Sequence, residues 1–218
     1  MDNTKIAIEI FDDCANEYQD KFMALDLYHD SFDLFCATIE QENANILKLG
    51  CGPGNITKYL LKKRPGFHIL GTDLSEKMIQ LAKKNNPSAE FQICDCRNIH
   101  QITKKYDGVM CGFCLPYLSK KEAIKLITDV SNLLKDKGAF YMSTMEDDYT
   151  KSGFKSSSSG EEKQMYIHYH QADYLTKALR ENDFKIVSLQ RQIYPEQKDT
   201  TAKDLIIIAI KTKHHSYE

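Results

Sequence analysis

The chain has 218 residues, of which 42% are hydrophobic and 28% charged. Its 29 Lys and Arg residues nearly balance 31 Asp and Glu residues, which leaves a formal net charge of −2 at pH 7. This length suits a single domain over residues 1–218 with a substantial core. The charge balance excludes a bulk cationic field of the kind that holds nucleic acid or an anionic membrane, so we expect neither as a partner.

The apolar runs and the cysteines predict a cytoplasmic protein. No apolar run reaches the roughly 18–20 residues of a spanning helix, and the polar start MDNTK differs from a signal peptide. An odd number of cysteines, at positions 14, 36, 51, 94, 96, 111 and 114, favours reduced thiols. A zinc or redox pair is the alternative for Cys94-x-Cys96 and Cys111-x-x-Cys114, but both pairs fall at the ends of expected strands, so we expect no metal.

Helical spacing of apolar and aromatic residues predicts one or two helices within residues 1–40. From residue 45 on, apolar runs alternate with helical patterns. Strands are predicted at 45–50, 67–72, 89–94, 107–112 and 138–144, and helices at 55–64, 75–85, 98–104 and 120–135. The last helix is marked by the capping box Ser119-x-x-Glu122. Such alternation is typical of an α/β fold with a doubly wound, parallel sheet.

The C-terminal part has a different pattern. A helix at 171–182 precedes two apolar segments, 184–195 and 202–211, which only a short polar turn joins. A parallel crossover needs a dozen or more residues, so this pair is predicted to form an antiparallel hairpin at the sheet edge. Residues 146–170 leave the carboxyl end of the fifth strand. Their Ser156–Ser159 run predicts a mobile loop tip, and their aromatic end MYIHYH predicts an ordered, substrate-side lid.

The segment ILKLGCGPGN, residues 46–55, places Gly50, Gly52 and Gly54 directly after the first strand. Glycine suits positions where the backbone takes a positive φ or lies against a ligand, so three glycines in five residues indicate a built turn. A strand, a glycine turn and a helix in this order aim backbone N–H groups into the turn. In α/β proteins this arrangement holds nucleotide-like ligands.

The order of motifs from about residue 15 to 211 resembles the class I S-adenosylmethionine-dependent methyltransferases, and their small-molecule branch in particular. The family's first motif, an acidic residue, an apolar residue and G-x-G-x-G, is matched by Lys48, Leu49 and GCGPG. Its acidic residues after the second and third strands are matched by Asp73 in ILGTDLSEKM and Asp95 in FQICDC, and its fourth-strand region by YDGVMCGFCLPYLS. The resemblance implies a Rossmann-like fold of seven mostly parallel strands with a C-terminal antiparallel hairpin, and S-adenosylmethionine as cofactor.

The resemblance also implies roles for individual residues. The backbone of Gly50–Gly54 would pass along the methionine and ribose parts of the cofactor, and Asp73 would accept hydrogen bonds from both ribose hydroxyls. Asp95 would accept from the adenine amino group, while the Cys96 N–H donates to the ring. The implied cofactor-binding set is Tyr18, Gly50, Cys51, Gly52, Gly54, Asp73, Leu74, Met78, Asp95, Cys96 and Cys111.

Some of these residues have simpler alternatives. Asp73 could cap the helix that begins near Ser75, Asp95 could be a turn residue, and Met78, which with Leu74 would sandwich the adenine, could be core alone. Aromatic crowding at Tyr18, Phe22 and Tyr28 predicts that the N-terminal helices form a lid over the cofactor site, with ordinary helix-on-sheet packing as the alternative.

Lys48 departs from the family pattern, because the family carries a carboxylate here, on the side of the cofactor's cationic amino acid end. A like charge at 4 Å would cost about 1–4 kcal/mol, unless the lysine turns outward on its flexible stem. A non-catalytic, cofactor-binding or regulatory protein is therefore the alternative function. A dinucleotide-dependent oxidoreductase is disfavoured because its G-x-G-x-x-G fingerprint would need glycine at Asn55.

The expected acceptor is a small molecule with an O, N or C nucleophile. The FCLPY sequence after the fourth strand differs from the N/D-P-P-Y/F motif of nucleic-acid amino methylation. Methyl transfer depends mainly on positioning, and it needs a base only if the nucleophile must lose a proton. The candidate catalytic residues are Tyr117, His168 and His170. We expect a monomer or a homodimer.

Overall fold

The computed structural model describes residues 3–157, 160–193 and 203–212. Within them, seven strands form one sheet in the order β3-β2-β1-β4-β5-β9-β8. The parallel strands are β1 (Asn45–Leu49), β2 (His68–Asp73), β3 (Glu90–Ile93), β4 (Tyr106–Gly112) and β5 (Leu134–Glu146). Strand β9 (Lys203–Lys211) runs antiparallel to β5 and to the edge strand β8 (Phe184–Gln192). The predicted sheet and its C-terminal hairpin are thus confirmed.

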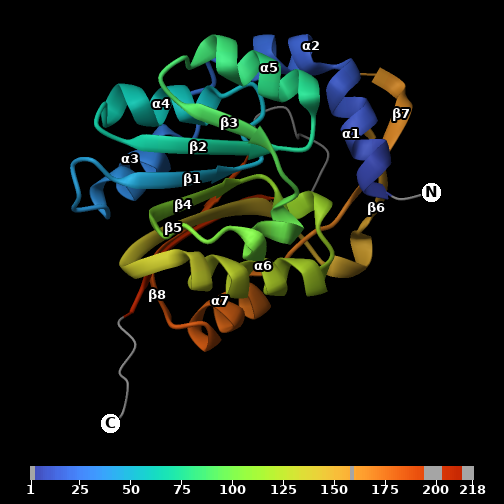
Figure 1. Cartoon of the computed structure of the whole chain (residues 1–218). Coiled ribbons are helices and arrows are strands. Elements are labelled where there is room, and N and C mark those ends of the chain that lie inside the picture. Colours follow the sequence, from blue (N-terminus) through green and yellow to red (C-terminus); the bar gives the residue numbers. More distant parts are fainter. Residues whose placement is uncertain (1–2, 158–159, 194–202, 213–218) are drawn as a thin grey trace.

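Helices cover both faces of the sheet, as the alternating sequence pattern predicts (Figure 1). Helices α3 (His29–Ala37) and α4 (Asn55–Lys63) pack on one face, and α6 (Lys120–Leu133) and α7 (Ala172–Glu181) on the other. Helix α5 (Glu76–Asn85) follows β2 and packs beside β3. Two-sided cover explains why β4 is buried along almost its whole length, which is typical of parallel strands.

Two further elements lie beyond the carboxyl ends of the strands. Helix α1 (Asn3–Asp13) stands beside a two-stranded hairpin of β6 (Gly153–Ser157) and β7 (Gly160–Ile167) in Figure 1. Ile10 of α1 shares a small apolar cluster with Met165 and Ile167 of β7. Helix α2 (Ala15–Phe22) joins α1 to the segment that leads into α3, so the N-terminal part contains three helices where one or two were predicted.

Residues 146–170 are more regular than predicted. A short 3-10 helix, η3 (Tyr149–Lys151), precedes the β6–β7 hairpin, in which Gly153 pairs with Ile167. Ser156 and Ser157 belong to β6, so the prediction of a loop tip is wrong for them, and residues 158–159 lie outside the described residues. Composition alone missed this hairpin, because backbone pairing and contact with α1 order a strand that serine does not favour.

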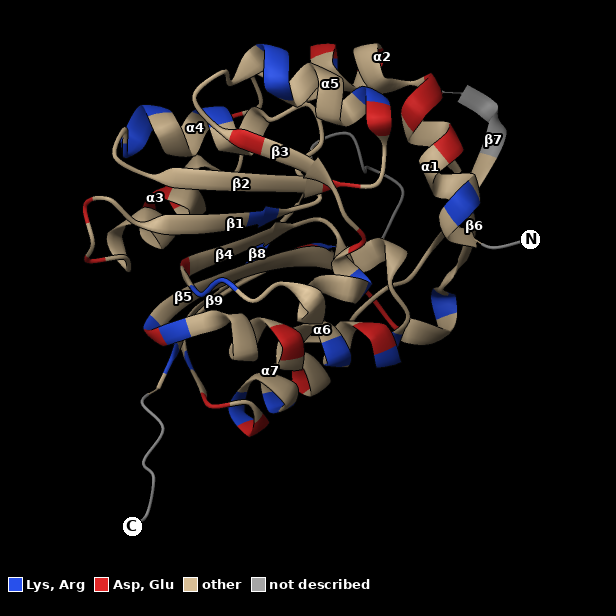
Figure 2. Ribbon diagram, viewed as in Figure 1, with Lys and Arg blue, Asp and Glu red and all other residues tan. Residues whose placement is uncertain are grey.

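The remaining differences are local. The helix predicted at 98–104 is the 3-10 helix η1 (Cys96–Gln101), and a second one, η2 (Leu115–Tyr117), follows β4. Basic and acidic residues are interspersed over the helices (Figure 2). All seven cysteines lie in described segments and are free thiols. Within the described ranges, every helix is too short or too polar to cross a bilayer.

Candidate functional site

A cavity of about 170 Å³ lies at the carboxyl ends of the central strands, on the edge of the sheet where α/β proteins bind ligands. Its walls come from segments far apart in the sequence: α1, the turn after β1, the ends of β2 and β3, the region after β4, and β7. Eight of the predicted cofactor-binding residues line it. They are Tyr18, Gly50, Gly52, Asp73, Leu74, Met78, Asp95 and Cys96.

The turn after β1 needs glycine for two physical reasons. Gly50, Gly52 and Gly54 have φ values of 54°, 53° and 87°, a region that residues with a side chain rarely adopt. A Cβ on Gly50 would also stand 2.5 Å from Sγ of Cys114, and a Cβ on Gly54 would stand 2.2 Å from Nδ2 of Asn86. The glycines therefore let the turn lie close to its neighbours, and Gly54 begins helix α4 as its N-cap.

Asp73, the last residue of β2, is oriented by two backbone donors. Its Oδ2 accepts the Gly52 N–H at 2.8 Å, and its Oδ1 accepts the Ser75 N–H at 3.0 Å. The N-cap of α5 is Ser75, whose Oγ accepts from the Met78 N–H, so Asp73 itself does not take the cap position. Each carboxylate oxygen of Asp73 keeps acceptor capacity for a ligand that enters the cavity.

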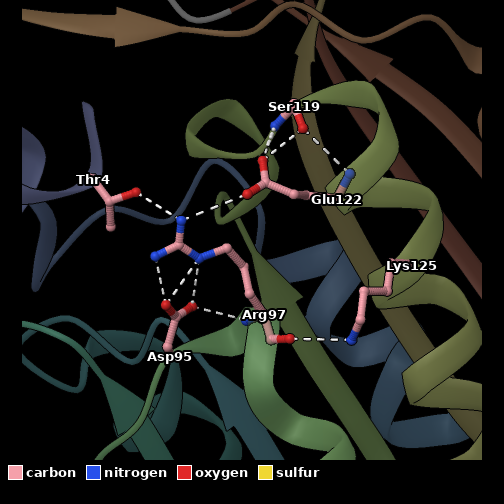
Figure 3. Close-up of polar contacts among 6 residues, drawn as sticks. All are labelled: Thr4, Asp95, Arg97, Ser119, Glu122 and Lys125. Atoms are coloured by element: carbon pink, nitrogen blue, oxygen red, sulfur yellow. Dashed lines mark hydrogen bonds and ion pairs between the residues drawn. The ribbon is translucent and has the colours of Figure 1, made fainter. Parts of the chain in front are cut away.

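Asp95 is held by Arg97, a residue that the sequence analysis missed (Figure 3). The Arg97 Nη2 donates to Asp95 Oδ2 at 2.6 Å, and Nε donates to both carboxylate oxygens, at 3.0 and 2.8 Å. The Arg97 Nη1 donates to Thr4 of α1 at 2.9 Å and pairs with Glu122 of α6 at 3.5 Å. The signal available in the sequence was the position of Arg97 two residues after Asp95, where one guanidinium can reach the carboxylate.

Helix α1 closes one side of the cavity. Thr4, Ala7, Ile8 and Phe11 line it, at the spacing of one helical face. The two ends of α1 are fastened to different strand ends, Thr4 to Arg97 after β3 and Asp12 to Ser75 after β2. An amphipathic helix held in this way forms the lid that was predicted for this part of the chain.

Of the aromatic residues predicted for the lid, Tyr18 lies at the cavity, whereas Phe22 and Tyr28 do not line it. Tyr18 lines the cavity, and its ring lies 4.4 Å from that of Phe22, which supports it from behind. Tyr28 does not reach the cavity, because its hydroxyl donates to Asp204 of β9 at 2.6 Å and its ring packs on Phe113. The prediction for Tyr28 is therefore wrong: its ring belongs to the core behind the cavity.

Tyr117 and His168 both line the cavity, as candidates for chemistry must. The Nδ1 of His168 lies 3.2 Å from the Tyr149 hydroxyl, and its backbone N–H donates to the Pro116 carbonyl at 2.8 Å. Burial lowers the pKa of His168, so its ring is neutral at pH 7. Burial also raises the pKa of Tyr117, so its phenol keeps its proton at pH 7.

His170 lies outside the cavity lining and is fully buried. Its Nε2 donates to the Leu115 carbonyl at 2.8 Å, while Nδ1 accepts from the Tyr174 hydroxyl. Burial lowers the pKa of His170 to about 4. Because both ring nitrogens are used within the fold, the prediction of a catalytic His170 is wrong: this histidine joins α7 to the segment after β4.

Three predicted cofactor-binding residues also lie outside the cavity lining. The Cys51 side chain is buried in an apolar cluster with Phe91 and Ile79, and its backbone N–H donates to the Thr72 carbonyl at 2.8 Å. Cys111 is fully buried within β4, and Gly54 is committed to the start of α4. Their contribution is to the shape of the turn and the sheet. In the described residues, no group of three or more His, Cys, Asp or Glu is placed to hold a metal ion.

Lys48 turns inward rather than toward solvent. It is 1% exposed, and its Nζ donates to the carbonyl oxygens of Leu49 at 2.6 Å and Gly50 at 2.7 Å. The pKa of the Cys114 thiol is lowered, first by a hydrogen bond from Cys111 and also by the charge of Lys48. The ammonium of Lys48 therefore lies beside the turn after β1. The family pattern has a carboxylate at this position of the sequence.

The sheet order, the C-terminal hairpin and the cavity at the strand ends define a Rossmann-like α/β protein of the methyltransferase type. The structure of the 1,6-didemethyltoxoflavin-N1-methyltransferase of Burkholderia thailandensis, solved with its substrate and S-adenosylhomocysteine, superposes with a TM-score of 0.71 at 20% identity. The match covers 96% of this chain and 89% of that one. At this identity the likeness is one of fold.

Sequence comparisons agree with the fold. Residues 46–138 match the family model described as "Methyltransferase domain". "Putative methyltransferase 235L" of Invertebrate iridescent virus 6 is 34% identical over 100 residues, which cover 46% of this chain and 37% of the viral protein. An uncharacterized methyltransferase of Alkaliphilus oremlandii is 24% identical over 139 residues, which cover 60% of this chain and 63% of that protein. The chain thus spans less than two thirds of these relatives, and its residues 46–138 are similar to their methyltransferase domain.

Proposed function

We propose that this protein transfers a methyl group from S-adenosylmethionine to a small-molecule acceptor. The observation that carries the proposal is the cavity in which Gly52, Asp73 and Asp95 meet from the ends of three neighbouring strands. In the proposed complex, Asp73 accepts hydrogen bonds from the ribose hydroxyls with the lone pairs that its two backbone donors leave free. Leu74 and Met78 provide apolar wall for the adenine.

The adenine end of the proposed site is held in place before any ligand binds. Arg97 fixes the plane of the Asp95 carboxylate, because its Nε, Nη2 and backbone N–H together give two donors to each oxygen. The adenine amino group would share an oxygen with Arg97, and little side-chain entropy would be lost in that step. The backbone N–H of Cys96 follows directly and is proposed to donate to the adenine ring. Preorganisation of this kind raises affinity without adding contacts.

A small acceptor suits the other walls of the cavity. Helix α1 and the β6–β7 hairpin border it, and Phe11, Tyr117, Tyr166 and His168 supply aromatic or imidazole surface. Such walls favour an acceptor with a flat or apolar part. The structurally similar Burkholderia protein is a 1,6-didemethyltoxoflavin-N1-methyltransferase with 1,6-didemethyltoxoflavin bound, which supports a small-molecule acceptor here.

The proposed reaction is an in-line displacement. The bond from the methyl carbon to sulfur breaks as the bond to the acceptor forms, and neutral S-adenosylhomocysteine leaves. His168 can take a proton from an acceptor that must lose one, because its ring is neutral at pH 7. Tyr117 keeps its proton and orients the acceptor through its hydroxyl.

Two measurements test the proposal. Calorimetry with S-adenosylhomocysteine should detect binding at one site per chain, and absence of binding to the folded protein would contradict the whole proposal. Incubation with methyl-labelled S-adenosylmethionine and the small-molecule fraction of a cell extract should then label an acceptor. Binding without any transfer would favour the second candidate, a cofactor-binding protein that does not catalyse, for which buried Lys48 beside the turn is the supporting observation.

A further inference from the structure

Lys48 is a buried cation that has no carboxylate partner among the described residues. Lysine is almost never fully buried unless it is paired, because removing an ammonium from water is costly. Two of its three N–H donors are used by the carbonyl groups of Leu49 and Gly50. Carbonyl dipoles satisfy hydrogen bonds but carry no net charge, so the ammonium still lacks an anion.

The position of this ammonium is directly behind the cavity wall. Gly50 and Gly112, at the ends of the adjacent strands β1 and β4, both line the cavity. The Nζ of Lys48 donates to the Gly50 carbonyl and lies 3.9 Å from the point where a Cβ on Gly112 would stand. The backbone of Gly50 and Gly112 therefore stands between the ammonium and the cavity, and Cδ1 of Ile56 lies 2.8 Å from the same Cβ point of Gly112.

The order of the strands indicates how the cofactor would lie across the strand ends. This step assumes that the cofactor binds as described under the proposed function, so the inference rests on that proposal. Asp95 follows β3 and Asp73 ends β2, and the next strands across the sheet are β1 and β4. If adenine lies at Asp95 and ribose at Asp73, the remaining part of the cofactor extends toward Gly50 and Gly112. That part is an amino acid, which carries one carboxylate and one ammonium.

We propose that the charge of Lys48 attracts the carboxylate of this amino acid end across the Gly50 and Gly112 backbone and thereby sets its orientation. The Leu49 and Gly50 carbonyl groups already accept from the charged Nζ of Lys48, so a second ammonium at these oxygens would be repelled by a like charge. The ammonium of the ligand is therefore turned away from Lys48, and the carboxylate takes the nearer position. The buried cation acquires its anion only when the ligand binds, and this makes the carboxylate a determinant of specificity.

The first test uses the parent protein and two probes that differ by one group. S-adenosylhomocysteine carries the carboxylate, and its decarboxylated analogue keeps only the ammonium. Calorimetry at low salt should give about 10- to 100-fold tighter binding for S-adenosylhomocysteine, the range expected for attraction between opposite charges near a protein surface. Equal affinities, or tighter binding of the decarboxylated analogue, would overturn the inference.

The second test removes the charge of Lys48. Lys48→Met, which keeps an unbranched apolar stem, should lose most of the preference for S-adenosylhomocysteine over its decarboxylated analogue. Lys62→Met, at an exposed position on α4, is the matched control and should keep that preference. An unchanged preference in Lys48→Met would contradict the inference, and it would be the expected result if the Cys114 thiol served as the counter-ion instead.

The two proposals fail in different ways. If the folded parent binds neither probe, nor 5′-methylthioadenosine, which lacks the whole amino acid end, the proposed function fails. If the parent binds 5′-methylthioadenosine and both probes with one common affinity, the function stands and the role of Lys48 fails. Should Lys48→Met not fold, the comparison of probes on the parent still decides the question.

Discussion

The backbone N–H of Gly52 donates to Oδ2 of Asp73 at 2.8 Å and so joins the turn after β1 to the last residue of β2. The Ser75 N–H holds the other oxygen at 3.0 Å, which fixes the plane of the carboxylate. A ligand that donates to this carboxylate therefore meets acceptors already in position. The same contact means that loss of the carboxylate also loosens the turn.

Asp73→Ala is expected to weaken the binding of S-adenosylhomocysteine by about 1–3 kcal/mol, the scale of hydrogen bonds to a charged group. Calorimetry on the folded variant measures this change. Glu76→Ala, at an exposed position in the first turn of α5, is the control and should bind like the parent. Parent-like affinity in Asp73→Ala would show that the ribose assignment is mistaken.

Arg97→Met is expected to loosen the adenine end and the lid together. The guanidinium holds both Asp95 and Thr4 of α1, so its loss should weaken S-adenosylhomocysteine binding by about 1–3 kcal/mol and speed amide hydrogen exchange in α1. Thr4→Val removes the hydroxyl on α1 that accepts from Arg97 and should speed exchange with a smaller loss of affinity. Arg180→Met, on the exposed side of α7, is the control. Unaltered exchange in α1 in both site variants would contradict the fastening role.

His168→Gln is expected to lower turnover of the acceptor while leaving S-adenosylhomocysteine affinity nearly unchanged, because its ring lines the acceptor side of the proposed site. If His168 is the base, the loss should be about 10²–10⁴-fold for an acceptor that must lose a proton. Steady-state kinetics and calorimetry on the same preparation separate the two effects. Turnover equal to that of the parent would remove His168 from the mechanism.

We expect His170 to affect the pH dependence of folding stability and not the methyl-transfer reaction. Its pKa is about 4 in the folded protein against 6.5 when unperturbed, so between these values the unfolded state binds more protons. Stability is therefore fully present above pH 6.5 and is lost as the pH falls toward 4. From pH 7.5 to pH 5 the His170 contribution is expected to cost about 2 kcal/mol.

Urea unfolding at several pH values measures this term. In His170→Gln the acid-dependent loss should shrink by about 2 kcal/mol, while stability at pH 7.5 falls because two buried hydrogen bonds are disturbed. His29→Gln, on α3, is a control for general effects of losing an imidazole. A pH profile identical to that of the parent would contradict the assigned role.

The strands and the glycine turn could be predicted because each carries a local signal. Buried parallel strands require apolar runs, and the turn after β1 requires glycine at positive φ, so both leave marks within a few residues. Asp73 was identifiable in the same way, as an acid at the end of a strand. The single-domain organisation, the cytoplasmic location and the oligomeric state stay predictions.

The sequence by itself determined the α/β class, the order of the elements and the residues at the carboxyl ends of β1, β2 and β3, because those features depend on periodicity and turn chemistry along a short stretch of chain. Only the tertiary structure decided which side chains share the cavity. It brought Thr4 to Arg97 across 93 positions, separated His168 from His170, and buried Lys48 beneath the turn. Such outcomes depend on how elements distant in sequence pack against one another, and no local pattern records that packing.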